Sequence, residues 1–375
     1  MRILLTCHVR FASAMAWYTF HLARGLIKQG HEVRLSAKRG SPLADWAIKE
    51  GLPGYYSRDY RSGNPLELYN SYSELRHAIK EFMPEILNPH CPPGHAFAAL
   101  ACNRKIPLIR TVADPRPPKS HFINRYLHEY LTDGMIYSTA SSLARYDRVF
   151  KFIRTLEKVI LPGLDLSLFP DANNTSLRKK LNVPDDALFA VIVARMSPEK
   201  GQELLIEALA MLSLEDRRKI VVLLTGDDSK ERAVHHLEAL ARTKGVLECL
   251  RFAPRQSDIK PLLNEIDLGI ITSVRSEAVC RVALEYMAYS KPIISTDVNI
   301  LPEVVRDGIN GWCVPVTDPK RFANALQAAI SDRMALKKLG AQGYELLNSE
   351  FSLDNMTNKT IEFYQKVSER HGRAH

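Results

Sequence analysis

Short β-forming runs alternate with longer helical patterns along almost the whole of this 375-residue chain. Strands that alternate with helices of this length predict an α/β fold with parallel, doubly wound sheets. The clearest helical period runs from Ala16 to Lys28, and Gly30 follows its end. The predicted strands of the first series are Arg2–Thr6, Glu32–Ser36, Ile86–Asn88, Leu108–Val112, Gly134–Tyr137 and Val159–Leu161.

The alternation starts again after Pro170–Ser176, a stretch rich in turn-forming residues. A chain of this length usually exceeds one hydrophobic core, so we predict two Rossmann-like domains. The predicted strands of the second series are Leu188–Ala194, Ile220–Thr225, Leu247–Phe252, Leu268–Ile271, Pro292–Ser295 and Trp312–Val314. The predicted helices between and after them include Gln202–Leu212, Lys230–Thr243, Ile259–Asn264 and Val279–Tyr289.

These patterns give the predicted domain organisation. An N-terminal domain covers residues 1–165, a linker covers 166–184, and a second domain covers 185–350. A C-terminal helix over 351–375 is expected to pack back toward the first domain. Ligands of open α/β folds bind beyond the carboxyl ends of the strands, so functional residues are sought there.

The formal net charge of +9 is distributed unevenly. Residues 1–160 hold 23 Lys and Arg against 13 Asp and Glu, whereas residues 161–375 hold 28 against 29. The basic excess in the first half suggests an anionic partner, such as a phosphorylated substrate, a lipid headgroup surface or a nucleic acid. A solvated basic surface with no specific partner explains the excess equally well.

Several functional classes are not supported by the sequence. No apolar run approaches the ~18 residues of a membrane span, and Arg10 follows the first apolar run too soon for a signal peptide. We therefore expect a cytoplasmic protein. The six cysteines form no CxxC pair, which is typical of reduced, buried side chains. The loop Cys7–Ser13 lacks the GxGxxG pattern of a dinucleotide site, and neither a GxxxxGK[ST] loop nor an HExxH motif is present.

Two cations follow the first strand of the second domain. Arg195 and Lys200 flank a strand-to-helix turn, and Gly201 stands at the helix entrance. Cations beside the positive end of a helix can hold a diphosphate, although surface turns often contain such residues without a ligand. Gly226-Asp227 ends the next strand and is also compatible with simple turn chemistry.

Glu277 and Glu285 stand eight residues apart in a mostly apolar segment. On a continuous helix their carboxylates would be about 80° apart, so both could face one ligand. A single glutamate on a helix is usually a solvated surface group. The apolar neighbours here favour a buried helix, which makes that explanation weaker.

With these motifs in order, the chain resembles the retaining glycosyltransferases of the GT-B fold, in particular the large family 4 group. The similarity is densest from Val159 to Val316. It rests on Glu-x7-Glu, Arg-x4-Lys-Gly, Gly226-Asp227, the stretch from Pro292 to Gly311, and the joint from Ile160 to Phe169.

The resemblance implies a nucleotide-sugar site in the second domain. Arg195 and Lys200 would bind the diphosphate and stabilise charge on the leaving group. Glu277 would bind hydroxyls of the donor sugar and Glu285 the ribose. The implied donor contacts also include Gly226 and Asp227 and the segment that follows Glu277: Ala278, Val279, Cys280 and Arg281. The resemblance implies no cofactor and no metal, and a UDP-sugar is the favoured donor.

The chain departs from the family pattern in the first domain. It has Ala12 and Ser13 where a glycine pair is common, and Ala113 where a histidine is common. Asp114 or His90 is therefore a candidate for part of that histidine's catalytic role. His90 follows a strand end and is expected to face the cleft, although a lone loop histidine is more often structural.

The first domain is the one that binds the acceptor in this family, and it carries the basic excess. The predicted acceptor residues are Ala12, Ser13, Arg110, Arg116 and Lys119, the last three in a segment that mixes cations with aromatic residues. Such a surface suits a phosphorylated glycolipid and an anionic membrane. We therefore expect a peripheral enzyme on the inner face of the cytoplasmic membrane, in lipopolysaccharide core or related surface-glycan synthesis, with no nucleic-acid partner.

Two other readings of the sequence stay open. One is a nucleotide-sugar epimerase on the same fold, which Glu-x7-Glu together with Arg195 and Lys200 disfavours. The other is a catalytically silent nucleotide-sugar-binding or scaffold protein, which the departures at Ala12, Ser13 and Ala113 allow.

Overall fold

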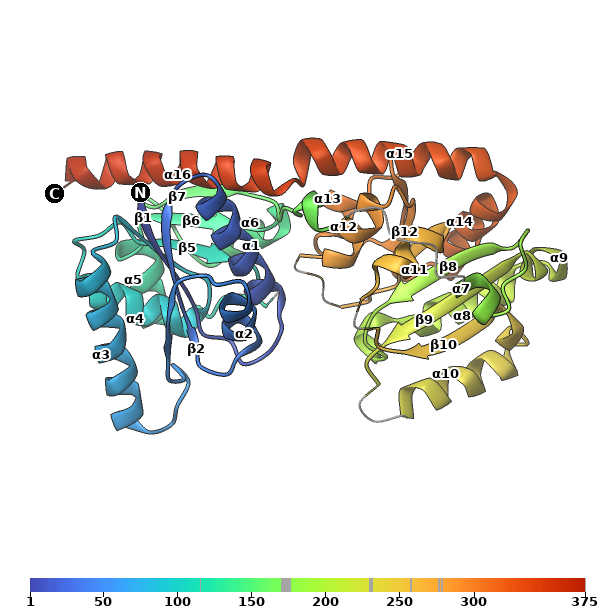
Figure 1. The fold of residues 1–375 in the computed structure, drawn as a ribbon, viewed down its shortest axis with the longest axis horizontal. Helices are drawn as coiled ribbons and strands as arrows, with labels where there is room; N and C mark the ends of the chain where they lie inside the picture. Colours follow the sequence, from blue (N-terminus) through green and yellow to red (C-terminus); the bar gives the residue numbers. More distant parts are fainter. Residues whose placement is uncertain are drawn as a thin grey trace. The chain divides into compact units, whose positions relative to one another are not determined.

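The computed structural model describes residues 1–114, 116–169, 177–228, 232–256, 258–275, 277 and 279–374. The chain forms two compact units. Unit 1 comprises Met1–Asp165 and Glu350–His375, and unit 2 comprises Leu166–Ser349 (Figure 1). The turn-forming stretch Pro170–Ser176 and the predicted donor residue Ala278 lie outside the described residues.

Unit 1 is built on parallel strands. Four of them, β1 (Arg2–Cys7), β2 (Glu32–Lys38), β3 (Gly54–Ser57) and β4 (Ile86–Pro89), lie in the order β3-β2-β1-β4. Three more, β5 (Ile109–Val112), β6 (Gly134–Tyr137) and β7 (Leu156–Val159), continue in chain order. A parallel bridge between Leu87 and Leu108 joins the two groups. The predicted α/β class with parallel sheets is confirmed.

One strand of unit 1 was predicted in the wrong place, and one was missed. The last strand is Leu156–Val159, paired with β6, and not Val159–Leu161. It lies at the sheet edge and is only partly buried, so it lacks the apolar run that a central strand shows. The edge strand β3 was not predicted, because its sequence Gly-Tyr-Tyr-Ser is short and its first three residues are only partly buried.

Helices cover both faces of the unit 1 strands. They are α1 (Ala14–Lys28), α2 (Pro42–Lys49), α3 (Pro65–Phe82), α4 (Pro92–Cys102), α5 (Phe122–Tyr130), α6 (Ala140–Asp147) and α16 (Leu353–Ala374). Side chains of Ser13, Ser41, Asn64 and Thr139 cap the N-termini of α1, α2, α3 and α6. In Figure 1, α4 and α5 lie on the other side of β5 and β6 from α16.

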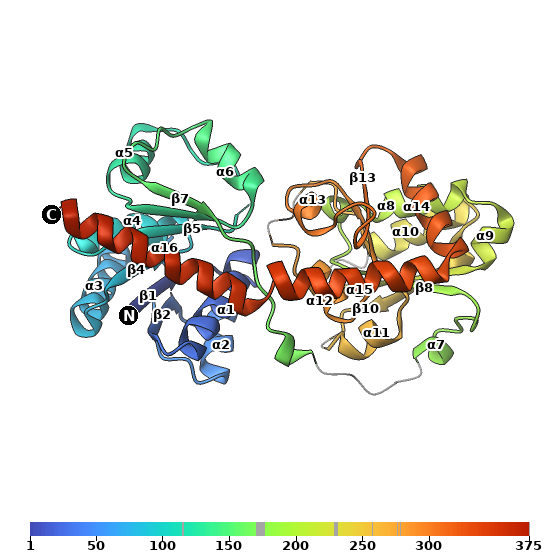
Figure 2. The same cartoon turned by 90° about the horizontal axis from the view of Figure 1, so that it is seen from above.

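The last helix, α16, belongs to unit 1 and lies along its sheet (Figure 2). It packs against α1 at Gly25, where a Cβ atom would stand 2.1 Å from Oγ1 of Thr357. The hydroxyl of Tyr364 donates a buried hydrogen bond of 2.6 Å to Oδ1 of Asn88 in β4. These contacts tie the end of the chain to the first strand series.

Unit 2 contains one six-stranded parallel sheet. Its strands are β8 (Leu188–Val193), β9 (Ile220–Gly226), β10 (Leu250–Pro254), β11 (Leu268–Ile271), β12 (Ile293–Thr296) and β13 (Gly311–Val314), in the order β10-β9-β8-β11-β12-β13. The helices are α7 (Leu177–Lys180), α8 (Gln202–Met211), α9 (Leu214–Arg218), α10 (Arg232–Thr243), α11 (Lys260–Glu265), α12 (Arg281–Ala288), α13 (Leu301–Val304), α14 (Pro319–Ser331) and α15 (Arg333–Glu350). β8 and β11 are neighbours, so their carboxyl-end loops meet.

Two described elements of unit 2 begin two or more residues later than predicted. Helix α12 begins at Arg281 and not at Val279, because Cys280 has a φ of +45°, in the left-handed region. Strand β10 begins at Leu250 because Leu247–Cys249 forms a short 3-10 turn. The predicted helix start at Lys230 lies outside the described residues. Among the described helices, none combines the length and apolar character that crossing a bilayer requires.

Candidate functional site

The site begins where the loops after β8 and β11 touch. Gly201 has a φ of +61°, and a Cβ atom there would stand 2.3 Å from the carbonyl oxygen of Thr272. The hydroxyl of Thr272 donates to the carbonyl of Lys200 at 2.7 Å, and the amide of Val274 donates to the carbonyl of Glu199 at 2.9 Å. Glycine is the residue that accepts both the left-handed backbone and this close approach. The two loops therefore form one bonded surface.

Lys200 and Glu277 meet on this surface, as an ion pair between residues 77 positions apart in the chain. The side chains are 20% and 13% exposed, so water reaches the pair only in part. The hydroxyl of Ser273 donates to Oε1 of Glu277 at 2.6 Å and accepts from Nζ of Lys200 at 3.4 Å. The three side chains thus form a fixed polar cluster at the carboxyl ends of β8 and β11.

Glu285 lies on the buried face of α12, where only 2% of it is exposed. Nε of Arg281, one helical turn earlier, donates to its carboxylate at 2.6 Å. Burial raises the pKa of Glu285, and the charge and hydrogen bond of Arg281 offset that rise only in part. The prediction that this helix is buried on much of its circumference is confirmed, because Ala283 to Met287 are all buried.

The residues between the two glutamates are held against the sheet. Val279 and Cys280 are buried, and burial raises the pKa of the Cys280 thiol well above its ordinary value. The ring of Tyr286 lies over Gly269 in β11, where a Cβ atom would stand 2.3 Å from the ring. Its hydroxyl donates to the carbonyl of Val191 at 3.2 Å. The start of α12 is therefore fixed relative to β8 and β11.

A cavity of about 190 Å³ opens between these elements. Lys200, Ser273, Glu277, Cys280 and Arg281 line it, together with residues from the ends of β8 and β11. Two cations and one carboxylate around a small cavity can bind a group that is anionic at one end and rich in hydroxyls at the other.

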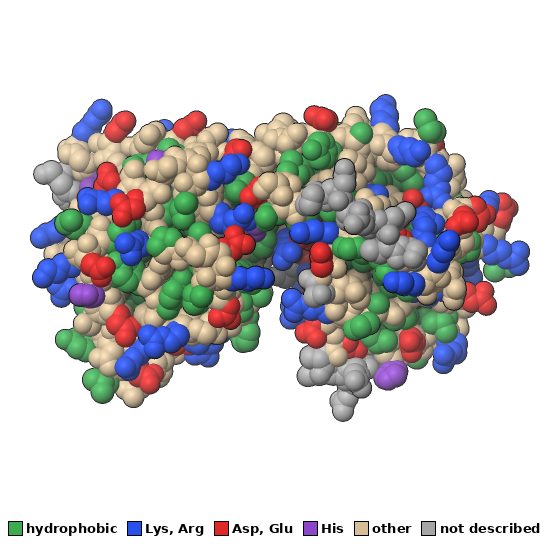
Figure 3. Space-filling model, in the orientation of Figure 1, with side chains coloured by type: hydrophobic (Ala, Val, Ile, Leu, Met, Phe, Trp, Pro, Cys, Tyr) green, Lys and Arg blue, Asp and Glu red, His purple; other side chains and the backbone are tan. Residues whose placement is uncertain are grey.

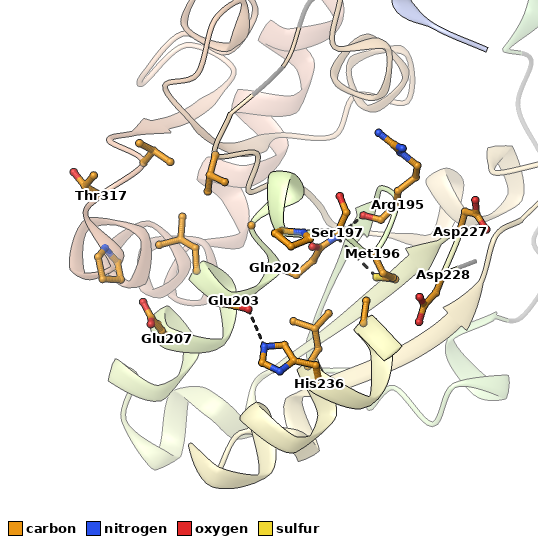
Figure 4. Close-up of a pocket in the computed structure, with 18 residues that line it drawn as sticks. Arg195, Met196, Ser197, Gln202, Glu203, Glu207, Asp227, Asp228, His236 and Thr317 are labelled. Carbon is orange, nitrogen blue, oxygen red and sulfur yellow. Dashed lines mark hydrogen bonds and ion pairs between the residues drawn. The ribbon is translucent and has the colours of Figure 1, made fainter. Parts of the chain in front are cut away.

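Arg195, Gly226 and Asp227 lie on the other side of the β8 loop. A Cβ atom at Gly226 would stand 1.7 Å from the carbonyl oxygen of Ala194, so the end of β9 runs directly against this loop. The amide of Met196 donates to the carbonyl of Asp227 at 3.0 Å. Arg195 and Asp227 line a larger cavity of about 720 Å³, which also contains the hydrogen-bonded pair Glu203 and His236 (Figure 4).

The structure separates the two predicted diphosphate ligands. Lys200 lines the smaller cavity, whereas Arg195 lines the larger one. In Figure 4 the exposed guanidinium of Arg195 points away from the Glu203–His236 pair. The side-chain amide of Gln202 holds the carbonyl of Arg195 at 2.8 Å, which fixes the backbone and leaves the long side chain to rotate.

The predicted residues of the first domain are divided between surface and interior. Ala12 is exposed, and Ser13 caps α1 by accepting from the amide of Ala16 at 3.3 Å. The expectation that His90 faces a cleft was wrong, because its ring is completely buried and contacts Asn88 at 3.0 Å. Burial, together with the charge of Arg110, lowers its pKa well below the ordinary value. Its interior position comes from the pairing of its amide with the carbonyl of Thr6 at the end of β1.

Asp114 is engaged by Arg116, whose guanidinium donates to both carboxylate oxygens at 2.5 to 2.9 Å. Burial raises the pKa of Asp114, but the hydrogen bonds and charge of Arg116 outweigh that effect and leave it below the ordinary value. Arg110 is not on the surface as expected, since it belongs to β5 and donates to the carbonyl of Pro89 at 3.1 Å. Lys119 is exposed.

One cavity of about 350 Å³ in unit 1 is bordered by Arg110, Asp114, Arg116 and Lys119. Sequence reasoning missed its other polar lining residues, which are Arg61, His95, Asn124, His128 and Tyr146. It also missed Ser273 in unit 2. Ser273 follows β11 by two residues, so its place beyond a strand end was a usable signal, whereas Arg61 and His128 carry no local pattern.

Both halves of the chain match models of glycosyltransferase families. Residues 173–346 match "Glycosyl transferases group 1", and residues 15–167 match "Glycosyltransferase Family 4". A D-inositol 3-phosphate glycosyltransferase of Streptomyces bingchenggensis is 27% identical over 92% of this chain and 73% of its own length. One of the same name from Geodermatophilus obscurus is 30% identical over 58% of this chain, and the match spans about half (48%) of that relative.

A lipopolysaccharide core biosynthesis glycosyltransferase, LpsE of Rhizobium meliloti, is 31% identical over 49% of this chain and 52% of its own length. Among solved structures, HepE of Anabaena in complex with UDP has a TM-score of 0.84 at 18% identity, over 98% of this chain and all of that one. WaaG, a glycosyltransferase involved in lipopolysaccharide biosynthesis, has a TM-score of 0.66 at 17% identity, over 96% and 99%. At these identities the structural likeness establishes the fold, which is GT-B as predicted.

Proposed function

Since the two halves of the chain match glycosyltransferase family models and its fold is GT-B, we propose that it transfers a sugar from a nucleotide-diphosphate sugar to a phosphorylated acceptor. The observation that carries the proposal is the cluster of Lys200, Ser273 and Glu277 at the carboxyl ends of β8 and β11. Ligands of open α/β sheets bind at such strand ends.

The proposed donor is a UDP-sugar. HepE, which resembles this chain over 98% of its length, was solved with UDP and with UDP-glucose. Lys200 would hold the diphosphate, and Arg195 would reach it by rotation of its exposed side chain. Glu277 would accept hydrogen bonds from sugar hydroxyls, and Glu285 with Arg281 would bind the ribose side. In this proposal Gly226 and Asp227 contribute by shaping the loop after β9.

We propose further that the reaction uses no metal, because Lys200 and Arg195 already offer positive charge where the leaving diphosphate forms. The amides beyond Glu277 would add donors to that charge. We expect the transfer rate to stay unchanged in excess EDTA and added Mg²⁺ to have no effect afterwards. A rate that falls tenfold in EDTA and returns with Mg²⁺ would overturn this part.

The proposed acceptor carries phosphate. Arg110, Arg116 and Lys119 border the 350 Å³ cavity of unit 1, and Arg61 adds a fourth cation. Relatives named D-inositol 3-phosphate glycosyltransferase and a lipopolysaccharide core biosynthesis glycosyltransferase support an anionic acceptor, in surface-glycan synthesis or a related pathway. We place the enzyme at an anionic membrane, where such a lipid-linked acceptor would be found.

Retention of anomeric configuration is proposed from the Glu-x7-Glu pattern of Glu277 and Glu285. The epimerase and the silent binding protein are the competing functions. A proton NMR spectrum of the product distinguishes all three, since a retaining transferase yields a glycoside with the anomeric configuration of the donor. An epimerase converts the nucleotide sugar without an acceptor, and a silent protein leaves it unchanged.

The first test is calorimetric titration with UDP, GDP and ADP. Tight binding of UDP that Lys200→Met weakens is expected, with the exposed Lys219→Met as a matched control in the same unit. Equal and weak binding of all three nucleotides would remove the support for a UDP-sugar donor. Slow hydrolysis of the matching nucleotide sugar, lost in Glu277→Ala, would exclude the silent protein.

A further inference from the structure

Helix α5 (Phe122–Tyr130) exposes a row of large apolar side chains. Phe122, Ile123, Tyr126 and Tyr130 are 79%, 60%, 55% and 56% exposed. At about 100° per residue they fall within roughly 100° of one another, on one face of the helix. The rings of Tyr126 and Tyr130 stack at 5.6 Å. We call these four residues the α5 stripe.

The opposite side of α5 is fixed to unit 1. Leu127 and His128 are buried, and the His128 ring stacks on Phe150 at 4.5 Å. The stripe is therefore a second apolar face that the core of the unit does not use. Soluble proteins seldom expose contiguous apolar residues unless something binds them.

The loop before β7 extends the same surface. The amide of Lys151 donates to Oε1 of Glu129 at 2.9 Å, and the hydroxyl of Thr155 donates to the carbonyl of His128 at 3.2 Å. Between these two anchors on α5, the loop presents Ile153, which is 84% exposed, and Arg154. A cation and an apolar side chain thus stand beside the stripe.

At Tyr130 the stripe reaches a cavity of about 410 Å³. Arg104, Arg154 and Arg370 line it, and within the described part of the chain their guanidiniums have no hydrogen-bond or ion-pair partner. The two carboxylates of the cavity have other partners, one of which, His371, also lines the cavity. Glu129 accepts from Arg125 and Lys151, and Asp133 accepts from the amide of Leu108 at 2.9 Å and pairs with His371 at 3.2 Å.

We infer that unit 1 docks on an anionic lipid bilayer, with the α5 stripe inserted among the headgroups and a lipid phosphate held by Arg104, Arg154 and Arg370. Tyrosine and arginine side chains suit this depth, because each joins an apolar part to a polar end. Phe122, Ile123 and Ile153 offer no polar end, which favours hydrocarbon over a nucleic acid. Figure 3 shows that the opposite face of unit 1 carries Lys and Arg side chains mixed with Asp, Glu and hydrophobic ones.

This inference deepens the proposed lipid-linked acceptor and rests on that proposal for its biological role. Its test uses neither donor nor acceptor, so it can fail while the proposed transfer reaction stands. The full chain is sedimented with phosphatidylcholine vesicles and with vesicles in which a third of the lipid is phosphatidylglycerol. Binding to the anionic vesicles that weakens in 0.5 M salt is expected.

Two variants examine the two parts of the surface. Phe122→Ser with Tyr126→Ser removes half of the stripe, and Arg104→Gln with Arg154→Gln and Arg370→Gln empties the cavity of arginine. Since a basic residue at an anionic surface is worth roughly fivefold in affinity, the triple variant is expected to bind about a hundredfold more weakly. The stripe variant is expected to lose binding at least tenfold.

Matched controls come from unit 2. Leu214→Ser with Met334→Ser removes exposed apolar side chains, and Lys320→Gln with Lys337→Gln and Lys338→Gln removes three charges. Both controls should bind vesicles as the unaltered chain does, and all variants should bind UDP unchanged if they are folded.

Three results would overturn the inference: no vesicle binding by the unaltered chain, equal loss in the unit 2 charge control, or unaltered binding of either unit 1 variant. Gel filtration tests the alternative that a second copy of this chain, and not a bilayer, covers the stripe. If the chain self-associates and only the stripe variant is monomeric, while vesicles bind none of them, the stripe is an interface between two copies.

Discussion

The contact between Lys200 and Glu277 predicts opposite effects of their removal on UDP affinity. In the proposed donor site the Lys200 ammonium must serve both the Glu277 carboxylate and the diphosphate. Lys200→Met removes the attraction for the diphosphate. Glu277→Gln keeps the size and the hydrogen bond from Ser273 but removes a negative charge that competes for Lys200.

The partial burial of the pair sets the magnitude. Two unit charges about 4 Å apart interact by about 4 kcal/mol at an effective dielectric constant of 20, the value suited to sites near a protein surface. Competition from Glu277 and residual water reduce the net loss in Lys200→Met to about 2 kcal/mol, which is roughly 30-fold in Kd. A carboxylate about 8 Å from the diphosphate repels it by roughly half as much as it would at 4 Å, which is about 1 kcal/mol after the same reduction, so Glu277→Gln should tighten UDP binding by about fivefold.

Isothermal titration at low and high salt measures both effects. The double variant completes a cycle, in which Lys200→Met should cost more in the Glu277→Gln background than alone. Lys219→Met, in an exposed pair with Glu215, is the charge-matched control and should leave UDP affinity unchanged. With a UDP-sugar, Glu277→Gln should lower the turnover. Weaker UDP binding in Glu277→Gln, equal to that in Lys200→Met, would refute the competition and indicate that Glu277 only holds the loop in place.

Three further predictions concern stability and the shape of the site. Gly201→Ala should cost at least 2 kcal/mol in urea unfolding and also weaken UDP binding, because the Cβ atom meets Thr272. Gly245 also has a positive φ, but a Cβ atom there would have no neighbour within 4 Å, so Gly245→Ala should cost less. Glu285→Gln should be more stable than the unaltered chain above about pH 4.5 and equal to it below. The pKa of Glu285 is raised in the folded state, so the unaltered chain loses stability as the pH rises and this carboxyl ionises. Thermal unfolding from pH 4 to pH 8 tests the sign. Tyr364→Phe should cost about 1 kcal/mol in urea, since it removes one buried hydrogen bond while Oδ1 of Asn88 keeps its contacts with Thr111 and His90. No loss would mean that this bond adds nothing to the attachment of α16.

The sequence predicted the central strands of the sheets well and the edge strands poorly. Central parallel strands are buried on both faces, so β1, β8, β9 and β11 read as continuous apolar runs. The edge strands β3 and β7 are only partly buried and leave no such run. Helix α12 was predicted two residues too early, because cysteine is not a residue type that signals the left-handed backbone found at Cys280.

The same distinction applies to the site. Lys200, Glu277 and Glu285 could be named from their positions after strands and within an apolar helix. Their partners depend on the order of strands in the sheet, because β8 and β11 are neighbours although two strands lie between them in the chain. Arg110 was assigned to an acceptor-binding surface although it lies within the predicted strand Leu108–Val112, and β5 buries it. Charge alone does not determine exposure where a backbone carbonyl such as that of Pro89 can accept from the side chain.

The two spaced carboxylates each hold a cation, Glu277 with Lys200 and Glu285 with Arg281. Stability does not explain this arrangement. Burial raises the pKa of Glu285 even beside Arg281, so ionisation of Glu285 lowers the stability of the folded state relative to the unfolded state. Apolar residues in place of a buried ion pair are often neutral or stabilising. A buried carboxylate that lowers stability is better explained by a ligand, for which Lys200 and Arg281 supply charge at one cavity while Glu277 and Glu285 keep them in place. The argument requires that Glu285→Gln gain stability and lose affinity for the nucleotide sugar together. A variant that gains stability and keeps its affinity would leave the carboxylate without a functional reason.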